Sequence, residues 1–167
     1  MEINNSYLLA EIKTKFESDV INCDEQFGLL SVELSRTKIL ELLEYLFQHS
    51  DLQMQFLTDI CGVHYPQKSG NEFGVVYHLH SLINNIRLRI KCFMPTDDTN
   101  IQSVSNLFSA ANWMERETFD FYGINFTGHP NLKRILNVDE MDYFPMRKEY
   151  PLEDGTRTDK DDTYFGR

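Results

Sequence analysis

The chain opens with apolar positions that recur at helical spacing and then changes to short apolar runs. Leu8, Ile12 and Phe16 lie four residues apart, which predicts an amphipathic helix over residues 6–19. Two strands are predicted next, over residues 20–22 and 27–34, because both stretches are apolar and are separated by polar residues. We expect the chain to turn at that polar stretch, residues 23–26.

A second helix and three longer strands follow. Ser35 is a typical helix-capping residue, and the wide apolar face between Ile39 and Phe47 predicts a helix behind it. The predicted strands cover residues 56–63, 73–79 and 86–94. The last two alternate apolar and polar side chains, which indicates one buried and one exposed face.

A third helix is predicted over residues 101–121, closed by Gly123. The resulting order is helix, strands, helix, strands, helix. This order predicts an α+β fold in which helices cover one face of a mainly antiparallel sheet, followed by an extended C-terminal arm.

The character of the sequence changes after Gly123. Residues 123–152 contain three prolines and no regular period, yet they keep many apolar side chains. We therefore expect residues 1–122 to form the α+β domain and residues 123–152 to be an extended segment that docks on another chain. Residues 153–167 are polar and acidic, and we expect them to be disordered in isolation.

The charge narrows the classes of partner. The 167 residues include 16 Lys and Arg and 26 Asp and Glu, which gives a net charge of -10. Such acidity excludes nucleic acid as a main partner and disfavours attraction to anionic lipid. The sequence has no run approaching the roughly 20 apolar residues that cross a bilayer. The first residues do not resemble a secretion signal, so we expect a protein of the cytosol or of a membrane's cytosolic side.

The cysteines are the first candidate ligands. Cys23, Cys61 and Cys92 include no CxxC pair, so their spacing fits neither a disulfide framework nor a zinc or iron–sulfur site. We expect all three to pack in the core.

Three histidines leave open a freestanding metal-dependent enzyme. His78 and His80 share one strand face, and His129 is the third candidate ligand, with His64 also available. The alternative is that the first two simply belong to a polar strand face. The sequence contains no GxSxG nucleophile motif and no glycine-rich nucleotide loop.

One strand face carries three cations, Arg87, Arg89 and Lys91. This stripe is either a solvated face or a complement to an acidic patch on a partner, and the sequence leaves both interpretations open.

The most informative stretch runs from Trp113 to Leu136. Arg116 and Asp120 are four residues apart on the predicted helix and can pair there. Glu115, Glu117 and Asp120 together concentrate negative charge, which would destabilise a lone surface helix. We therefore expect cations from elsewhere to meet this helix.

The segment ERETFDFYGINFTGHPNLKRIL, residues 115–136, resembles the hallmark motif of the 30 kDa subunit family of respiratory complex I, which is the C-subunit family of the bacterial NADH–quinone oxidoreductase. The segment PMRKEYPL, residues 145–152, resembles the second block of that family, and FLTDI, residues 56–60, resembles a weaker strand motif. Two departures are His64, where the family commonly has Asp, and Tyr143-Phe144, where it has a Gly-His pair.

The resemblance implies a non-catalytic subunit of the hydrophilic arm of proton-translocating NADH:quinone oxidoreductase. It implies no cofactor in this chain, with flavin and iron–sulfur clusters in partner subunits. The implied partners are the large quinone-site subunit, of the 49 kDa type, and cluster-bearing neighbours. The implied location is peripheral, on the cytoplasmic side of the cell inner membrane, with contact to the membrane only through the complex.

Docking onto those partners is expected from a set of residues in the two blocks: Glu115, Arg116, Glu117, Asp120, Tyr122, Gly123, Phe126, Gly128, His129, Pro130, Arg134, Pro145, Arg147 and Lys148. An equivalent subunit of a membrane-bound hydrogenase, or of an F420- or ferredoxin-linked oxidoreductase, is the nearest alternative, because the sequence of this one subunit does not identify the electron donor.

Overall fold

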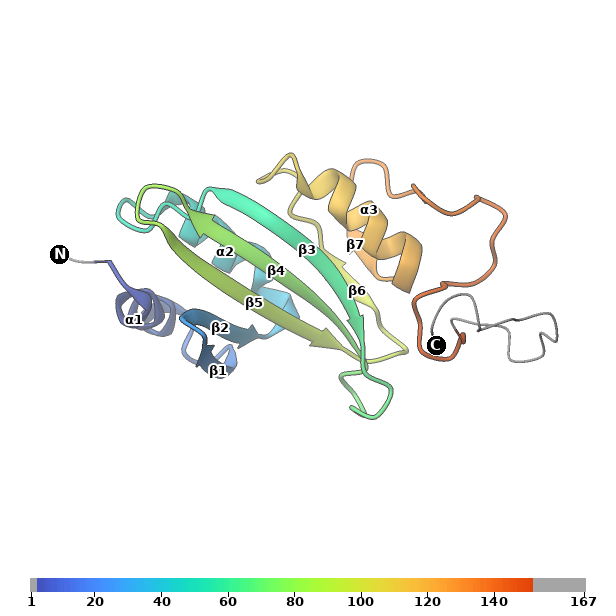
Figure 1. Ribbon diagram of the computed structural model, residues 1–167, viewed down its shortest axis with the longest axis horizontal. Coiled ribbons are helices and arrows are strands. Elements are labelled where there is room, and N and C mark those ends of the chain that lie inside the picture. Colours follow the sequence, from blue (N-terminus) through green and yellow to red (C-terminus); the bar gives the residue numbers. More distant parts are fainter. Residues whose placement is uncertain (1–2, 152–167) are drawn as a thin grey trace, which may run out of the picture.

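The computed structural model describes residues 3–151 (Figure 1). Its helices are α1 (Asn5–Phe16), α2 (Ile39–Gln48), which the 3-10 turn η1 (Arg36–Lys38) precedes, and α3 (Ala111–Tyr122). Its strands are β1 (Val20–Gln26), β2 (Leu29–Leu34), β3 (Phe56–His64), β4 (Phe73–Ser81), β5 (Ile86–Met94), β6 (Asn100–Gln102) and β7 (Asn125–Thr127). Within the described part, no helix is long and apolar enough to cross a membrane.

Five strands form one sheet in the order β1-β2-β5-β4-β3. Only β2 and β5 run parallel, and the other neighbouring pairs are antiparallel. A parallel pair requires a crossover, and the chain makes it through α2, β3 and β4. The prediction of an α+β fold with a mainly antiparallel sheet is confirmed.

The helices share one face of this sheet. Leu42, Leu43 and Leu46 of α2 join the core cluster that contains Tyr77 and Leu88 of the sheet, and Figure 1 shows α2 behind β3, β4 and β5. Residues of α1 join the same cluster. The opposite face of β4 and β5 is covered by no helix among residues 3–151.

Strands β4 and β5 show the alternation that the sequence predicts. In β4, Tyr77 and Leu79 are buried, whereas His78 between them and His80 beyond them are partly exposed. In β5, Leu88 and Ile90 are fully buried. The three cations of β5 (Arg87, Arg89 and Lys91) therefore lie on the uncovered face, as predicted.

The turn predicted at residues 23–26 is wrong. These residues continue β1, and the chain turns at Phe27 and Gly28, whose φ angles are 53° and 73°. Two successive positive φ values are what a type I′ hairpin turn requires, and Asn-Gly usually supplies them. Phenylalanine is not a turn-forming residue, so its type gives no warning of the turn.

The helix predicted over residues 101–121 begins only at Ala111. Ile101 lies in β6, and the loop between β6 and α3 contains Val104 and Phe108. All three side chains are buried, and their spacing of three and then four residues imitates a helix. The end of the helix is as predicted, because Gly123 adopts the left-handed conformation with φ 72°.

The expected boundary between residues 122 and 123 does not separate two units. Strand β7 follows α3 and pairs with β6, and Ile124 and Phe126 beside it are buried in the core cluster. The domain therefore continues to Thr127. We call residues 128–151, which contain no helix or strand, the arm. The expected acidic tail, residues 153–167, lies outside the described residues.

The three cysteines differ in burial. Cys92 is fully buried, and burial raises the pKa of its thiol far above the usual range. Cys23 and Cys61 are only partly buried, so the expectation that all three pack in the core is wrong for two of them. Both lie on edge strands, β1 and β3, where side chains have fewer neighbours.

Candidate functional site

Helix α3 is held against the edge strand β3. A side chain at Gly62 would meet the ring of Tyr122 at 2.5 Å and Thr118 at 3.1 Å, so the missing side chain lets the helix approach the strand closely. This contact fixes the last turn of α3. The arm begins shortly after that turn and returns to it.

Glu115 is fully buried near the start of α3. Its two carboxylate oxygens accept hydrogen bonds from Ser103 Oγ at 2.6 Å and from the Val104 N–H at 2.7 Å. Burial raises the pKa of this carboxyl to about 7, although both hydrogen bonds lower it. The carboxyl thus fastens the loop between β6 and α3, and its burial removes it from the expected docking surface.

Asp120 is also fully buried, and it binds the arm. Oδ1 accepts from Arg134 Nη1 at 2.7 Å, and Oδ2 accepts from the backbone N–H groups of Ile135, Leu136 and Asn137 at 2.8–3.0 Å. Burial alone would raise the pKa of Asp120, but the three N–H groups and Arg134 outweigh it and hold the pKa far below its usual range. The side chain acts within the chain, so it does not present a docking group to a partner.

The expected pair between Arg116 and Asp120 does not form. Arg116 donates instead to the carbonyl oxygens of Lys133 at 3.1 Å and Arg134 at 3.0 Å. Within the described residues, the arm supplies a cation to the acidic helix, because Arg134 pairs with Asp120. Glu117, in contrast, is exposed and remains available to a partner.

Arg134 connects four groups of the chain. Besides the Asp120 carboxylate it donates to the carbonyl oxygens of Asp120, Met141 and Tyr143, at 2.8–3.0 Å. Its guanidinium also lies 5.0 Å from the ring centre of Phe144. The planar guanidinium thus fixes both the start and the middle of the arm.

The second block of the arm returns to the C-terminus of α3. Arg147 Nε donates to the Tyr122 carbonyl at 2.8 Å, and its guanidinium lies 4.7 Å from the Phe144 ring centre. The Lys148 N–H donates to Nδ1 of His64 at 3.0 Å. Both departures from the resembled family, His64 and Phe144, therefore lie where the arm meets the domain. Pro145 is half-buried beside them.

The remaining expected docking residues divide between core and surface. Phe126 is in the core, and His129 is half-buried, with Nε2 3.0 Å from the Asn112 carbonyl. Gly128 and Pro130 are exposed at the start of the arm.

The arm also exposes apolar side chains. The exposed fractions are 65% for Leu136, 62% for Val138 and 46% for Met146. Tyr143 and Tyr150 pack on each other, with 4.9 Å between ring centres, and each remains 39% exposed. Leu136 and Val138 are absent from the expected docking set. Their apolar character in an aperiodic segment is the sequence signal that could have identified them.

The histidines do not gather into a metal site. His78 accepts from Arg89 Nε at 3.0 Å, His80 lies 3.2 Å from Asn85 Oδ1, and His129 lies in the arm. Among residues 3–151, no three His, Cys, Asp or Glu side chains are grouped so that they could hold a metal ion.

Comparison with known proteins identifies the family. The family described as respiratory-chain NADH dehydrogenase, 30 Kd subunit, matches residues 32–156. The NADH-quinone oxidoreductase C-subunit of Geobacter sulfurreducens is 36% identical over 163 residues, which cover 98% of this chain and 97% of that protein. The chain belongs to the 30 kDa subunit family.

Two further similarities agree with this family. The corresponding C-subunit of Citrifermentans bemidjiense is 38% identical over 98% of this chain and 97% of its own length. Among solved structures, the trypsin-resistant fragment (1-134) of Nqo5 superposes with a TM-score of 0.65 and 30% identity, over 76% of this chain and 98% of the fragment.

The 30 kDa fold also occurs in a different complex. A chain of an archaeal membrane-bound sulfane sulfur reductase has a TM-score of 0.74 over 88% of this chain and 85% of its own length. At 20% identity this likeness concerns the fold alone. The match of the 30 kDa family to residues 32–156 includes both sequence blocks, residues 115–136 and 145–152.

Proposed function

We propose that this chain is a non-catalytic structural subunit of the peripheral arm of NADH:quinone oxidoreductase, and that it docks through its own arm on the large quinone-site subunit. Two relatives that match it over nearly their full length are named as C-subunits of NADH-quinone oxidoreductase. In this role the chain supports electron transfer from NADH to quinone by holding neighbouring subunits in register.

The observation that carries the docking proposal is an anchored segment with exposed apolar side chains. Asp120 and Arg134 fix the arm to α3, yet Leu136 and Val138 are 65% and 62% exposed. Anchoring lowers the entropy lost on binding, because the segment is already ordered before it meets the partner. Apolar side chains presented in this way indicate a protein interface.

The redox groups are proposed to lie in the partners. The three cysteines stand on three different strands, β1, β3 and β5, without a CxxC pair. This arrangement does not supply the four thiolates of an iron–sulfur cluster. The chain would then reach the cytoplasmic side of the inner membrane only as part of the complex.

A pull-down in mild detergent tests the docking proposal. We expect tagged chain to co-purify with the quinone-site subunit and cluster-bearing neighbours, identified by mass spectrometry. The double variant Leu136→Asp and Val138→Asp should lower the recovered partner about tenfold or more, because two charges would be buried in the contact. Leu82→Asp, at a 67% exposed position in the turn between β4 and β5, is the matched control.

The same experiment distinguishes the alternatives. Flavin-bearing NADH-module subunits in the pull-down support the proposal, whereas a hydrogenase large subunit or an F420- or ferredoxin-linked donor module contradicts it. Stoichiometric metal in the purified chain would favour the freestanding enzyme. Full recovery of partners by the double variant would refute docking through the arm.

A further inference from the structure

Within residues 3–151, two arginines on the uncovered face of the sheet form no ion pair with an acidic residue. Among residues 3–151, Lys91 of the basic stripe pairs with Asp24 at 3.5 Å, but no ion pair involves Arg87 or Arg89. Arg89 Nε donates instead to a ring nitrogen of His78. The chain has 26 acidic residues against 16 basic ones, so carboxylates are abundant. Within the described residues none forms an ion pair with these two guanidinium groups, although Glu33 lines one hollow together with Arg89 and Asp59 lies 3.8 Å from the other ring nitrogen of His78.

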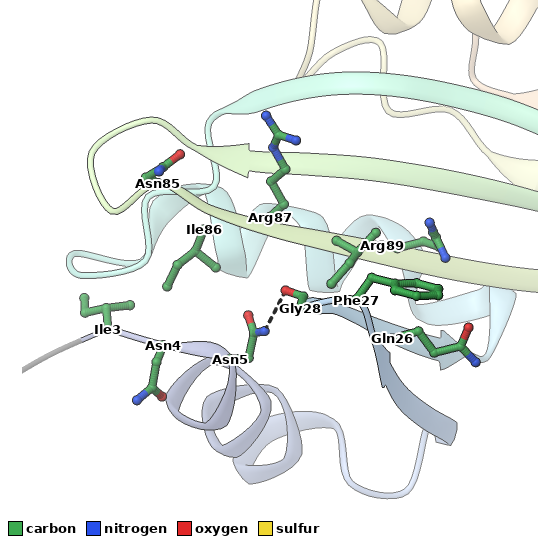
Figure 2. Close-up of a pocket in the computed structure, with 11 residues that line it drawn as sticks. Ile3, Asn4, Asn5, Gln26, Phe27, Gly28, Asn85, Ile86, Arg87 and Arg89 are labelled. Atoms are coloured by element: carbon green, nitrogen blue, oxygen red, sulfur yellow. Dashed lines mark hydrogen bonds between the residues drawn. The ribbon is translucent and has the colours of Figure 1, made fainter.

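The arginines stand between two hollows. One groove, of about 880 Å³, lies between the start of α1, the turn between β1 and β2, and the start of β5 (Figure 2). A second hollow, of about 470 Å³, lies farther along β5 and is lined by Tyr65 and Phe93 among others. Arg89 lines both hollows, and Arg87 lines the first. The face therefore combines cations with aromatic and aliphatic walls.

Phe27 points to contact with another molecule. It lines the first groove, its side chain is fully exposed, and its φ of 53° is unfavourable for an aromatic residue. Asn or Gly would adopt this turn more easily. A side chain that gains no burial and strains its own turn is explained if a partner covers it.

We propose that the uncovered sheet face around Arg87, Arg89 and Phe27 binds an acidic segment of a partner protein. Guanidinium groups bind carboxylates with two parallel hydrogen bonds, and an exposed aromatic ring beside them serves as an apolar anchor. Charge complementarity on this face favours a carboxylate-bearing occupant, because two guanidinium groups line the groove, and the exposed Phe27 ring beside them favours a protein segment. We expect this segment to belong to a subunit of the same complex, and this expectation rests on the proposed function.

Photo-crosslinking in cells tests this surface directly. Phe27 is replaced by benzoylphenylalanine in the full-length chain, and mass spectrometry identifies the attached peptide. We expect one protein segment with Asp or Glu beside the attachment point. The same replacement at Trp113, which is 58% exposed on α3, independently detects a partner that binds beside the arm.

Charge reversal then tests the pairing. Arg87→Glu should weaken the cross-linked contact about tenfold, and reversing the neighbouring acid of the partner to Arg should restore it. Lys13→Glu, an exposed cation of α1, should have no effect. Phe27→Asn, made in the chain without the cross-linker, should lower co-purification of the partner that the cross-link identifies, while leaving the melting temperature of the isolated chain unchanged or higher, which a purely structural role would not produce.

The outcomes separate this inference from the proposed function. A cross-link to a subunit of the complex, lost in Arg87→Glu and restored by the reversed acid, supports both. The same result with an acidic protein outside the complex supports the surface and contradicts the proposed function. No protein cross-link at Phe27, a cross-link to lipid alone, or a contact unaffected by Arg87→Glu overturns the surface, whatever Trp113 attaches to.

Discussion

Arg134 Nη1 lies 2.7 Å from Asp120 Oδ1, across a separation of 14 residues, and this pair closes the arm onto the last turns of α3. The Asp120 side chain is fully buried, and that of Arg134 is 10% exposed. A buried ion pair is worth little against an apolar replacement of both partners, but removing one partner leaves the other buried and uncompensated.

Asp120→Ala should therefore destabilise the chain strongly. The variant leaves Arg134 and the N–H groups of Ile135, Leu136 and Asn137 without their acceptor, and we expect a loss of about 3–5 kcal/mol. Urea denaturation measures this loss, and limited proteolysis should show earlier cleavage in the arm. Glu117→Ala, at an exposed position of α3, should stay within about 0.5 kcal/mol. A similar loss in both variants would contradict the assigned role of Asp120.

The attachment of the arm should also depend on pH. The pKa of Asp120 is depressed in the folded chain, so the stability that its carboxylate contributes is present above the ordinary aspartate pKa of about 3.9. It is lost as pH falls below that range and the carboxylate is protonated. Protease resistance of the arm should thus persist from neutral pH to about pH 4 and decline in stronger acid. A decline between pH 6 and 5 would exclude Asp120 as the controlling group.

Gly123→Ala should be more harmful than Gly128→Ala, although both glycines have positive φ. A Cβ at Gly123 would lie 2.5 Å from the Phe144 ring and 2.6 Å from Arg147 Nη2, whereas nothing lies within 4 Å of one at Gly128. We expect a loss of roughly 1–2 kcal/mol at Gly128 from backbone strain alone, and about 2–5 kcal/mol at Gly123. Equal losses in thermal unfolding would show that Phe144 and Arg147 do not pack as described.

Sequence patterns predict what is local in this fold. Alternation identified β5 from Ile86 to Met94, and Gly123 marked the end of α3, because each signal depends on residues that are neighbours in the chain. The start of α3 was not predictable in this way. Ile101 is held by pairing with Phe126, and a partner that distant leaves no local signal.

The same distinction applies to the candidate site. The acidic residues of α3 predicted a need for cations, and Arg134 is such a cation, but spacing alone suggested Arg116 as the partner of Asp120. Arg134 reaches Asp120 only because the chain reverses after Gly128. Composition predicted the exposed apolar residues of the arm, whereas the buried pairs depend on tertiary structure.

Glu115→Gln should make the chain more stable at neutral and alkaline pH. The pKa of Glu115 is raised to about 7 by burial, so the folded chain binds this proton more tightly than the unfolded chain does. The contribution of Glu115 to stability is therefore greatest below its unfolded pKa of 4.5 and falls as pH rises towards 7. Gln keeps an oxygen that can accept from Ser103 or Val104 and does not titrate, so the gain near pH 8 should be up to about 3 kcal/mol.

Denaturation measured between pH 5 and pH 8 checks this difference. The Glu115→Gln variant should lose less stability over that interval than the unmodified chain, and Glu117→Gln, at an exposed position, should follow the unmodified chain. If Glu115→Gln has the same dependence on pH as the unmodified chain, the carboxyl of Glu115 does not titrate in this interval.

Two truncations distinguish the domain from the arm. A chain that ends at Gly123 lacks β7 and the buried side chains of Ile124 and Phe126, each worth about 2–5 kcal/mol in a core, so it should not unfold cooperatively. A chain that ends at Asn131 keeps both, and Asp120 becomes solvated once the arm is gone. Circular dichroism during heating should show a sharp transition only for the longer chain. A cooperative transition in the shorter chain would show that β7 is dispensable and would favour a domain boundary at residue 122.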